Sequence, residues 1–229
     1  MYSSEALHRK AAREQGFTLV ELLVATVVSM LVLGGAVAVT SQIQSGYRRQ
    51  VEAAAAEQEG RYALDWLSKL IRAAGNNPYN VASSDCPGAG TVFEAVRFDP
   101  DGDGVNDDIR LQTDSYPPDG QVGGTTGTCD QANEDVTISF DPANKSITFF
   151  DNNLLGVATL RTDAVIQDLR FIYRDSNHQG LPDFAEPAPA NVFYVETQVT
   201  VATKTADPST GLPVTRTLTS EVRIRGRAF

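Results

Sequence analysis

The sequence predicts an α+β fold in which one long N-terminal helix, transmembrane and then amphipathic, packs on a mostly antiparallel β-sheet. Three observations predict this fold. An apolar run covers residues 17–39, no proline interrupts the chain between Phe17 and Asn77, and short β-branched segments separated by glycine- and proline-rich loops follow Asn80. One helical region followed by a run of strands is typical of an α+β domain.

The apolar run is 23 residues long, and apart from Glu21 its members are apolar, small or hydroxylated. At about 1.5 Å per residue the run extends roughly 34 Å, which exceeds a bilayer core of about 30 Å. Three basic residues precede it. The positive-inside bias therefore places residues 1–16 in the cytoplasm and the rest of the chain across the membrane.

A secretory signal peptide and an ordinary membrane anchor are the alternatives for this segment. A signal peptide has a shorter apolar region, followed by a small-residue cleavage site, whereas Gly16 precedes the run and no A-x-A pattern closes it. An ordinary anchor leaves Glu21 unexplained, because a carboxylate at that depth costs about 2.5–3.5 kcal/mol.

Residues 16–25, Gly-Phe-Thr-Leu-Val-Glu-Leu-Leu-Val-Ala, resemble the type III signal of type IV prepilins and type II secretion pseudopilins. The resemblance consists of a basic leader, a glycine, a phenylalanine, hydrophobic residues and then a glutamate. It implies that prepilin peptidase cleaves between Gly16 and Phe17 on the cytoplasmic side and that Phe17 becomes N-methylated. It also implies that residues 17–39 stay in the mature protein as an assembly helix.

Glu21 has a physical role in this interpretation. Cleavage exposes an α-amine at Phe17, and a residue four positions along lies about one helical turn away. Either that amine or the amine of a neighbouring subunit could pair with Glu21, which would remove both charges from hydrocarbon together. The family resemblance implies the second pairing, which sets the register of subunits in a filament.

Residues 40–75 are predicted to continue the helix as its amphipathic half, because Leu64, Leu67 and Ile71 recur on one face that needs a sheet to cover it. Gly75 is predicted to end this helix. Residues 76–229 then form a β-rich head, without an evident second-domain linker. The expected strands are Val92–Phe98, Ile109–Thr113, Val136–Phe140, Ser146–Phe150, Ala164–Tyr173, Val192–Thr203 and Leu218–Ile224.

Two segments of the head, Ile166–Tyr173 and Ser220–Arg225, resemble the PilW group of minor pilins. The large head and the absence of proline from the apolar run differ from many major pilins. The resemblance implies a pilin-like fold and a structural, non-enzymatic subunit. In this interpretation the chain crosses the inner membrane once and is then built into the tip complex that primes type IV pilus assembly, at the periplasm or cell surface. Its implied partners are prepilin peptidase and, through the N-terminal helix, other minor pilins and the major pilin.

Two other functions remain open from the sequence. The J-type minor pseudopilins of type II secretion look similar, and they use the same architecture in a piston rather than in a surface fibre. A ligand-binding minor pilin, adhesive or active in DNA uptake, belongs to a different functional class. The net charge of −10 opposes DNA binding, because a polyanion needs a broad basic face.

An aspartate-rich loop covers residues 98–109. Its five unpaired carboxylates within ten residues repel one another, and a hard divalent cation would relieve this repulsion. The loop therefore predicts a structural calcium site. The expected ligands, in an EF-hand-like register, are Asp99, Asp101, Asp103, the Val105 carbonyl, Asp107 and, as the closing ligand, Asp108. Arg110 occupies the position of the usual bidentate glutamate. A solvated hairpin turn, for which Asp-Gly is suitable, is the alternative.

Cys86 and Cys129 are the two cysteines, and both are predicted to lie in loops beyond the membrane. An even count in an oxidising compartment favours a disulfide, worth about 4 kcal/mol at most for a loop of this length. Two buried free thiols are the alternative. No nucleophile-with-base pattern, P-loop or phosphate-binding glycine loop appears in the sequence, so an enzyme is the weakest class.

Overall fold

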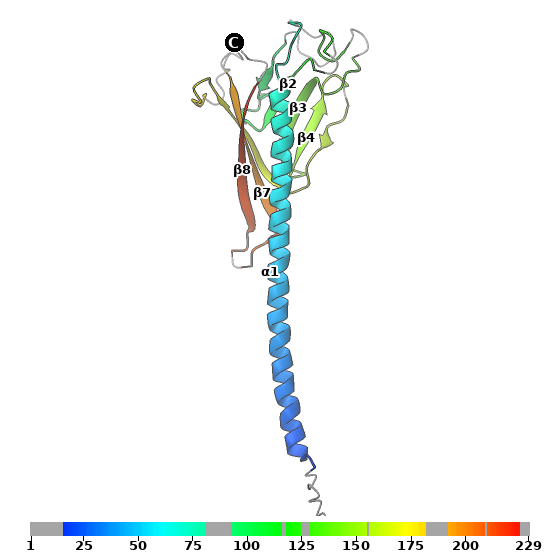
Figure 1. The fold of residues 1–229 in the computed structure, drawn as a ribbon, viewed down its shortest axis with the longest axis vertical. Coiled ribbons are helices and arrows are strands. Elements are labelled where there is room, and N and C mark those ends of the chain that lie inside the picture. The colour runs from blue at the N-terminus through cyan, green and yellow to red at the C-terminus, as the bar shows by residue number, and fades with distance from the viewer. Residues whose placement is uncertain are drawn as a thin grey trace, which may run out of the picture. The chain divides into compact units, whose positions relative to one another are not determined.

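The computed structural model describes residues 16–80, 93–115, 118–124, 129–154, 156–181, 192–208 and 210–224. The chain divides into two compact units, Met1–Arg48 and Arg49–Phe229, which are described separately below. Helix α1, Leu19–Ala73, contributes to both units (Figure 1).

The ends of α1 follow ordinary helix chemistry. Glu21 lies in its first turn and Arg72 in its last, and both charges oppose the partial charges of the helix ends. Gly75 adopts a φ of 75° just beyond the helix, a conformation that glycine reaches without steric cost. Its N–H donates to the Gln112 carbonyl (2.9 Å). The predicted termination at Gly75 therefore has the expected geometry.

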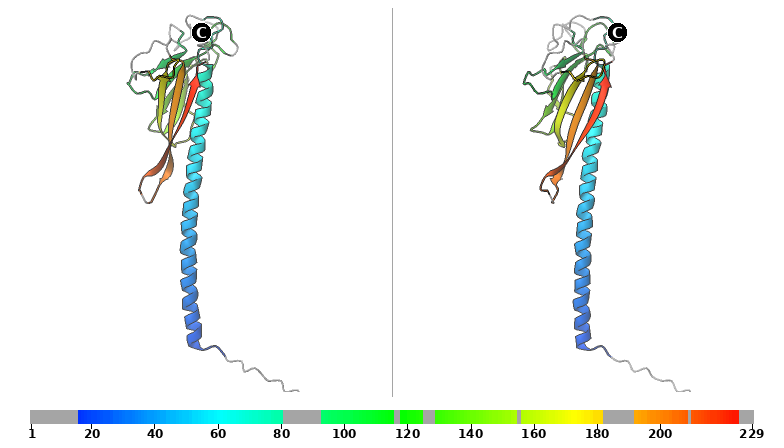
Figure 2. Two further views of the ribbon diagram at one scale, coloured as in Figure 1. Left: turned by 60° about the vertical axis from the view of Figure 1, so that its left-hand side comes forward. Right: turned by 90° about the vertical axis from the view of Figure 1, so that its left-hand side faces the viewer.

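The described strands form two antiparallel sheets (Figures 1 and 2). The five-stranded sheet follows chain order and contains β1 (Val96–Phe98), β2 (Asp108–Gln112), β3 (Asp135–Asp141), β4 (Ser146–Asp151) and β5 (Thr159–Leu160). The three-stranded sheet contains β6 (Ile166–Arg174), β7 (Tyr194–Ala206) and β8 (Pro213–Arg223), again in chain order.

The α+β fold predicted from the sequence is confirmed, but the expectation of one sheet is wrong. β6 pairs with β7 and not with β5. Backbone hydrogen bonds still link the two sheets, because the Phe171 N–H donates to the Asn106 carbonyl (2.8 Å) and the Ile166 N–H donates to the Lys145 carbonyl (2.9 Å). β5 was not predicted, since its two residues are both exposed and show no alternating pattern.

The core of the second unit lies between the later turns of α1 and both sheets. Leu67 and Ile71 of α1 are fully buried, as the predicted apolar stripe required. They belong to one hydrophobic cluster with residues of both sheets, and in both views of Figure 2 the strands lie along the same side of this part of α1. The fully buried members from the sheets are Ile109, Ile138, Ile147, Ile166, Phe171, Val195 and Val199.

Small and polar residues fix the helix against the sheets. A Cβ added at Gly60 would lie 2.7 Å from Leu218 Cδ1 and 2.9 Å from Val201 Cγ1, so the helix approaches β7 and β8 closely there. Farther along α1, the Ser68 and Ser220 hydroxyls are hydrogen-bonded at 3.1 Å. The absence of a side chain at Gly60 thus permits a close helix–sheet contact.

Candidate functional site

The start of α1 is a candidate processing and assembly segment. Residues 16–18 are not helical, and α1 begins at Leu19. The Gly16–Phe17 bond therefore lies in exposed, non-helical chain immediately before the helix. A protease needs its scissile bond outside regular structure, and exposed non-helical segments are where proteolytic cleavage concentrates.

Thr18 and Glu21 form a reciprocal capping box. The Glu21 N–H donates to Thr18 Oγ1 (3.2 Å), and the Thr18 N–H donates to Glu21 Oε2 (3.2 Å). Each side chain thus satisfies one backbone donor that the first helical turn leaves without an intrahelical acceptor. The sequence reasoning assigned Glu21 to assembly but missed Thr18, although the T-x-x-E pattern before an apolar run is the signal for this cap.

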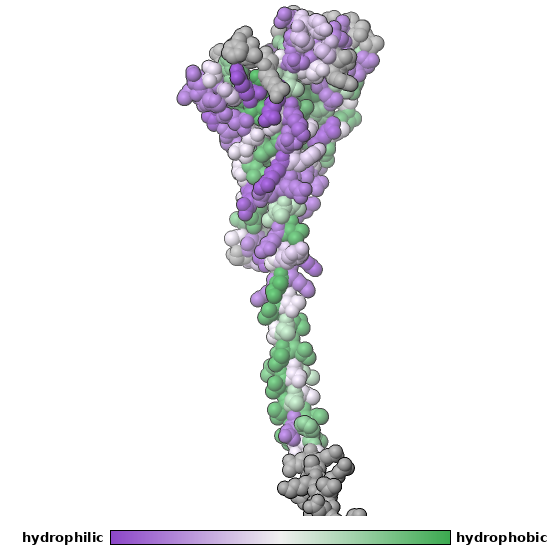
Figure 3. All heavy atoms as spheres, viewed as in Figure 1, coloured by the Kyte–Doolittle hydropathy of each residue, from purple (hydrophilic) through white to green (hydrophobic). Residues whose placement is uncertain are grey.

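The first unit presents a continuous apolar surface. Phe17 is 85% exposed and Leu31 is 72% exposed, and on the face that Figure 3 shows, hydrophobic residues predominate along the apolar part of α1. Among the residues that the structure describes, α1 is the one helix long and apolar enough to cross a membrane. An apolar surface of this extent requires a lipid or protein environment.

The aspartate-rich loop connects β1 to β2 and forms a second candidate site. One carboxylate oxygen each from Asp99, Asp101 and Asp108 lies within 4.8 Å of the other two. Asp103 is not a member of this group; its Oδ1 accepts from the Val105 N–H (2.7 Å).

Backbone geometry explains how the chain reaches this arrangement. Asp99 has a φ of 42°, and its carboxylate accepts from the N–H groups of Gly102, Asp103 and Gly104 at 3.0–3.1 Å. The loop therefore wraps around the Asp99 side chain. Asp108 begins β2, where its backbone pairs with Ser139.

The electrostatics of the loop disfavour its negative charges. Burial and, after it, the charge of Asp101 together raise the pKa of Asp108 from 3.8 to about 7. The pKa of Asp107 is also raised, first by burial and then by Asp103 and Asp101. Ionised carboxylates at low solvent exposure are costly unless a cation or a donor accompanies them.

The six predicted calcium ligands are thus only partly brought together. Of the five predicted aspartates, Asp99, Asp101 and Asp108 converge, whereas Asp103 and Asp107 lie outside that group. The Val105 carbonyl as a ligand, and binding itself, stay predictions. Hard oxygen donors of this kind are the ligands that calcium prefers. The sequence reasoning missed Tyr173 on β6, whose pKa is raised by burial and by the charges of Asp108 and Asp99.

The cysteine prediction falls partly outside the described residues. Cys86 lies outside them, and Cys129 has a φ of 44°. The Cys86–Cys129 disulfide therefore stays a prediction.

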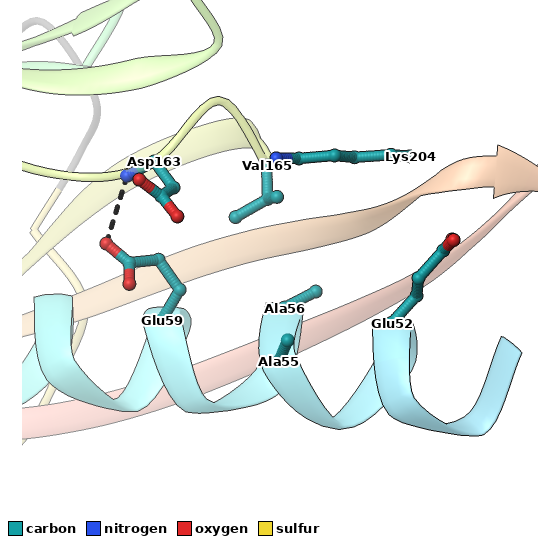
Figure 4. Close-up of a pocket in the computed structure, with 7 residues that line it drawn as sticks. All are labelled: Glu52, Ala55, Ala56, Glu59, Asp163, Val165 and Lys204. Carbon is teal, nitrogen blue, oxygen red and sulfur yellow. Dashed lines mark hydrogen bonds between the residues drawn. The ribbon is translucent and has the colours of Figure 1, made fainter. Parts of the chain in front are cut away.

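A cavity of about 160 Å³ lies between α1 and the sheets, and Figure 4 shows its seven lining residues. Glu59 Oε1 accepts from the Asp163 N–H (3.0 Å) at one end, and Glu52 accepts from the Thr205 hydroxyl at the other. Ala55 lies between these two glutamates on the helix. Both glutamates are thus used to hold the helix to the sheets.

Comparison with protein families finds the prokaryotic N-terminal methylation motif at residues 11–37. No curated protein and no solved structure matches the chain. The motif covers the predicted cleavage site, the Thr18–Glu21 cap and most of the apolar half of α1.

The motif and the fold together define a class. They indicate a type IV pilin or pseudopilin-like protein, in which a long apolar helix packs against antiparallel sheets. The prepilin motif implies processing by prepilin peptidase and assembly with other pilins in the membrane. The apolar helix fits the membrane anchoring typical of type IV pilins, and both features suggest a structural subunit rather than an enzyme.

Proposed function

We propose that the chain is a PilW-like minor pilin, a subunit of the tip complex that primes type IV pilus assembly. The observation that carries the proposal is the methylation motif at residues 11–37, which leads directly into a 55-residue helix and then a large β-rich head. The absence of proline from the apolar run and the PilW-like segments Ile166–Tyr173 and Ser220–Arg225 support the minor class.

In this proposal, prepilin peptidase cleaves between Gly16 and Phe17 and leaves a methylated α-amine on Phe17. The reciprocal hydrogen bonds with Thr18 hold the Glu21 carboxylate at the start of α1. An incoming subunit places its α-amine against that carboxylate, so two charges that hydrocarbon solvates poorly neutralise each other. The apolar surface around Glu21 supplies the remaining subunit contact.

A J-type pseudopilin would use the same chemistry in type II secretion, and a ligand-binding pilin would use it to carry an adhesive or DNA-binding head. The experiment that separates these functions is deletion of the gene in its own bacterium, with surface pili, exoprotein release and DNA uptake measured in parallel. The proposal expects loss of surface pili with normal exoprotein release. Loss of exoprotein release with normal piliation would assign the chain to secretion instead.

Complementation with Glu21→Ala tests the mechanism. We expect mass spectrometry to find the mature chain starting at Phe17, while the amount of the subunit recovered in sheared pili falls sharply. Asp65→Ala is the control, because Asp65 also lies on α1 but forms an exposed ion pair with Lys69 (2.6 Å). Normal incorporation of Glu21→Ala would refute the pairing, and a chain still starting at Met1 would refute the pilin assignment.

A further inference from the structure

We infer that the β1–β2 loop and β6 together form a calcium site, with Asp99, Asp101 and Asp108 as carboxylate ligands and the Tyr173 hydroxyl as a fourth oxygen. This site differs from the EF-hand-like register that the sequence predicts, because the structure selects three carboxylates and adds a residue from the other sheet. The inference does not depend on the proposed function in pilus assembly.

The buried carboxylate of Asp108 is the first argument. Asp108 is only 2% exposed, and its Oδ1 has no hydrogen-bond partner among the residues that the structure describes. Its Oδ2 accepts one long bond from the Asp101 N–H (3.3 Å). Leaving a buried charged group so poorly paired is costly, and nearby Arg110 does not relieve it because that guanidinium binds Asp135.

The hydroxyl of Tyr173 is the second and independent argument. Tyr173 is 5% exposed, and among the described residues its Oη has no hydrogen-bond partner either. The Tyr173 ring packs against that of Phe98, with the two centroids 3.6 Å apart, and Phe98 directly precedes Asp99, so Tyr173 lies beside the start of the acidic loop. Buried tyrosine hydroxyls usually find a partner, and an ion at the carboxylates would satisfy Tyr173 and Asp108 together.

The spacing of the oxygens suits calcium. Calcium–oxygen bonds of about 2.3–2.6 Å allow two ligands of one ion to lie up to roughly 5 Å apart. The three carboxylate oxygens lie within 4.8 Å of one another, so all of them can reach one ion. Three carboxylates balance a divalent charge better than they balance one another, and Asp101 is exposed enough to admit the ion from solvent.

The consequence is a link between the two sheets. Asp108 begins β2 in the five-stranded sheet, whereas Tyr173 lies on β6 in the three-stranded sheet. The ion would reinforce the backbone bond from the Phe171 N–H to the Asn106 carbonyl in the same region. The proposed role of calcium is therefore to hold the two sheets of the head together.

Calcium titration of the full chain in detergent micelles, after treatment with EDTA and its removal, tests the inference. Calorimetry should show one site with a dissociation constant of about 10⁻⁴–10⁻³ M, the range of extracellular calcium modules. Thermal unfolding should shift upward with calcium. Absence of both the binding heat and the melting shift in the unmodified chain would overturn the inference.

Three variants locate the ion. Asp108→Asn and Asp101→Asn each remove one charged ligand and should weaken binding by about tenfold or more, because ligand charge sets affinity in such sites. Asp103→Asn is the matched control, since it removes the same charge from the same loop but lies outside the group. It should change affinity by less than about threefold. Equal losses in all three variants would attribute binding to loop charge alone and overturn the site.

Tyr173→Phe tests the fourth ligand through terbium emission, a signal whose loss can be distinguished from misfolding. Terbium takes calcium sites, and a coordinated tyrosine transfers excitation energy to it, so the unmodified chain should show tyrosine-sensitised emission that calcium quenches by competition. Tyr173→Phe should lose most of that emission while retaining the calcium-free melting temperature. Undiminished emission from Tyr173→Phe would remove Tyr173 from the site and overturn the link between the sheets.

Discussion

Asp135→Asn should strongly destabilise the head, because Asp135 is fully buried and is the acceptor at the centre of a polar network. Its carboxylate accepts from Arg110 Nε (2.7 Å) and Nη2 (2.6 Å). It also accepts from Gln112 Nε2 and Asn152 Nδ2, both at 2.8 Å. The network joins β2, β3 and the turn after β4, so its loss would affect the centre of the five-stranded sheet.

The magnitude follows from what the substitution leaves behind. The Arg110 side chain is only 13% exposed, and an asparagine at position 135 would remove the carboxylate that its guanidinium binds through two nitrogens. The amide nitrogen of the introduced asparagine would also place a hydrogen-bond donor where four donors converge. Removing one member of a buried ion pair costs about 3–5 kcal/mol, a large share of the roughly 5–15 kcal/mol that stabilises a typical domain.

Urea unfolding of the full chain in detergent micelles measures this effect. Trp66 is the one tryptophan of the sequence, and its ring centroid lies 5.9 Å from that of Phe149 on β4. Its fluorescence therefore reports separation of α1 from the sheet that contains the network. Glu57→Gln is the control, because Glu57 pairs with the exposed Arg61 one helical turn away, and such pairs contribute about 0–1 kcal/mol.

A double-mutant cycle decides whether the pairing itself matters. Arg110→Met in the Asp135→Asn background removes the cation that Asp135 binds in the unmodified chain, so the double variant should cost about 1–3 kcal/mol less than the sum of the single variants. The reasoning would be refuted if Asp135→Asn changed the free energy of unfolding by less than about 1 kcal/mol. A strictly additive cycle would equally contradict it.

Two further predictions concern the second unit. Gly60→Leu should lower the free energy of unfolding by about 1–3 kcal/mol through overpacking against Val201. Gly46→Leu is the control and should not lower it, because a Cβ added at Gly46 meets nothing within 4 Å. Equal urea midpoints for both variants would contradict the close contact at Gly60. Arg174 lowers the pKa of Glu196 below 4.5 through a side-chain hydrogen bond, so the stability from this pair is present above pH 4.5 and is lost as the pH falls through the lowered pKa. Melting temperatures measured from about pH 6 to pH 3 should fall less steeply in Glu196→Gln, and an unchanged slope would remove this pair as a cause.

Local sequence patterns predicted the helix and most strands because the determining interactions are local. The run without proline, the stripe containing Leu67 and Ile71, and Gly75 at the end define α1 through neighbours a few residues apart. Strand positions follow from short alternating segments in the same way. The number of sheets was not predictable, since it depends on whether β6 pairs with β5 as well as with β7, and the alternation is satisfied in either case.

The candidate sites were likewise predictable only where their residues lie close together in the sequence. Gly16, Phe17 and Glu21 form a contiguous pattern, and the Thr18 cap was also readable from it. Tyr173 carries no local signal, because an alternating strand residue is normally assigned to the core. Only the contact of its ring with Phe98, at the start of the β1–β2 loop, places Tyr173 near the acidic residues. The sequence therefore located the acidic loop, and three of the aspartates that it proposed as ligands, Asp99, Asp101 and Asp108, converge in the folded chain.

The two candidate sites depend on different physical effects, so an experiment that refutes one of them leaves the other untouched. Glu21 lies in the first turn of α1. Its proposed function follows from the free-energy cost of placing a carboxylate in hydrocarbon. Asp108 and Tyr173 belong to the second unit, where Asp108 Oδ1 and Tyr173 Oη are buried without a hydrogen-bond partner among the described residues and so point to an ion. Glu21→Ala should therefore leave calcium-dependent melting intact, and Asp108→Asn should leave the mature chain starting at Phe17. A calcium site that disappears does not weaken the pilin assignment, and a chain that is never processed does not weaken the argument for calcium.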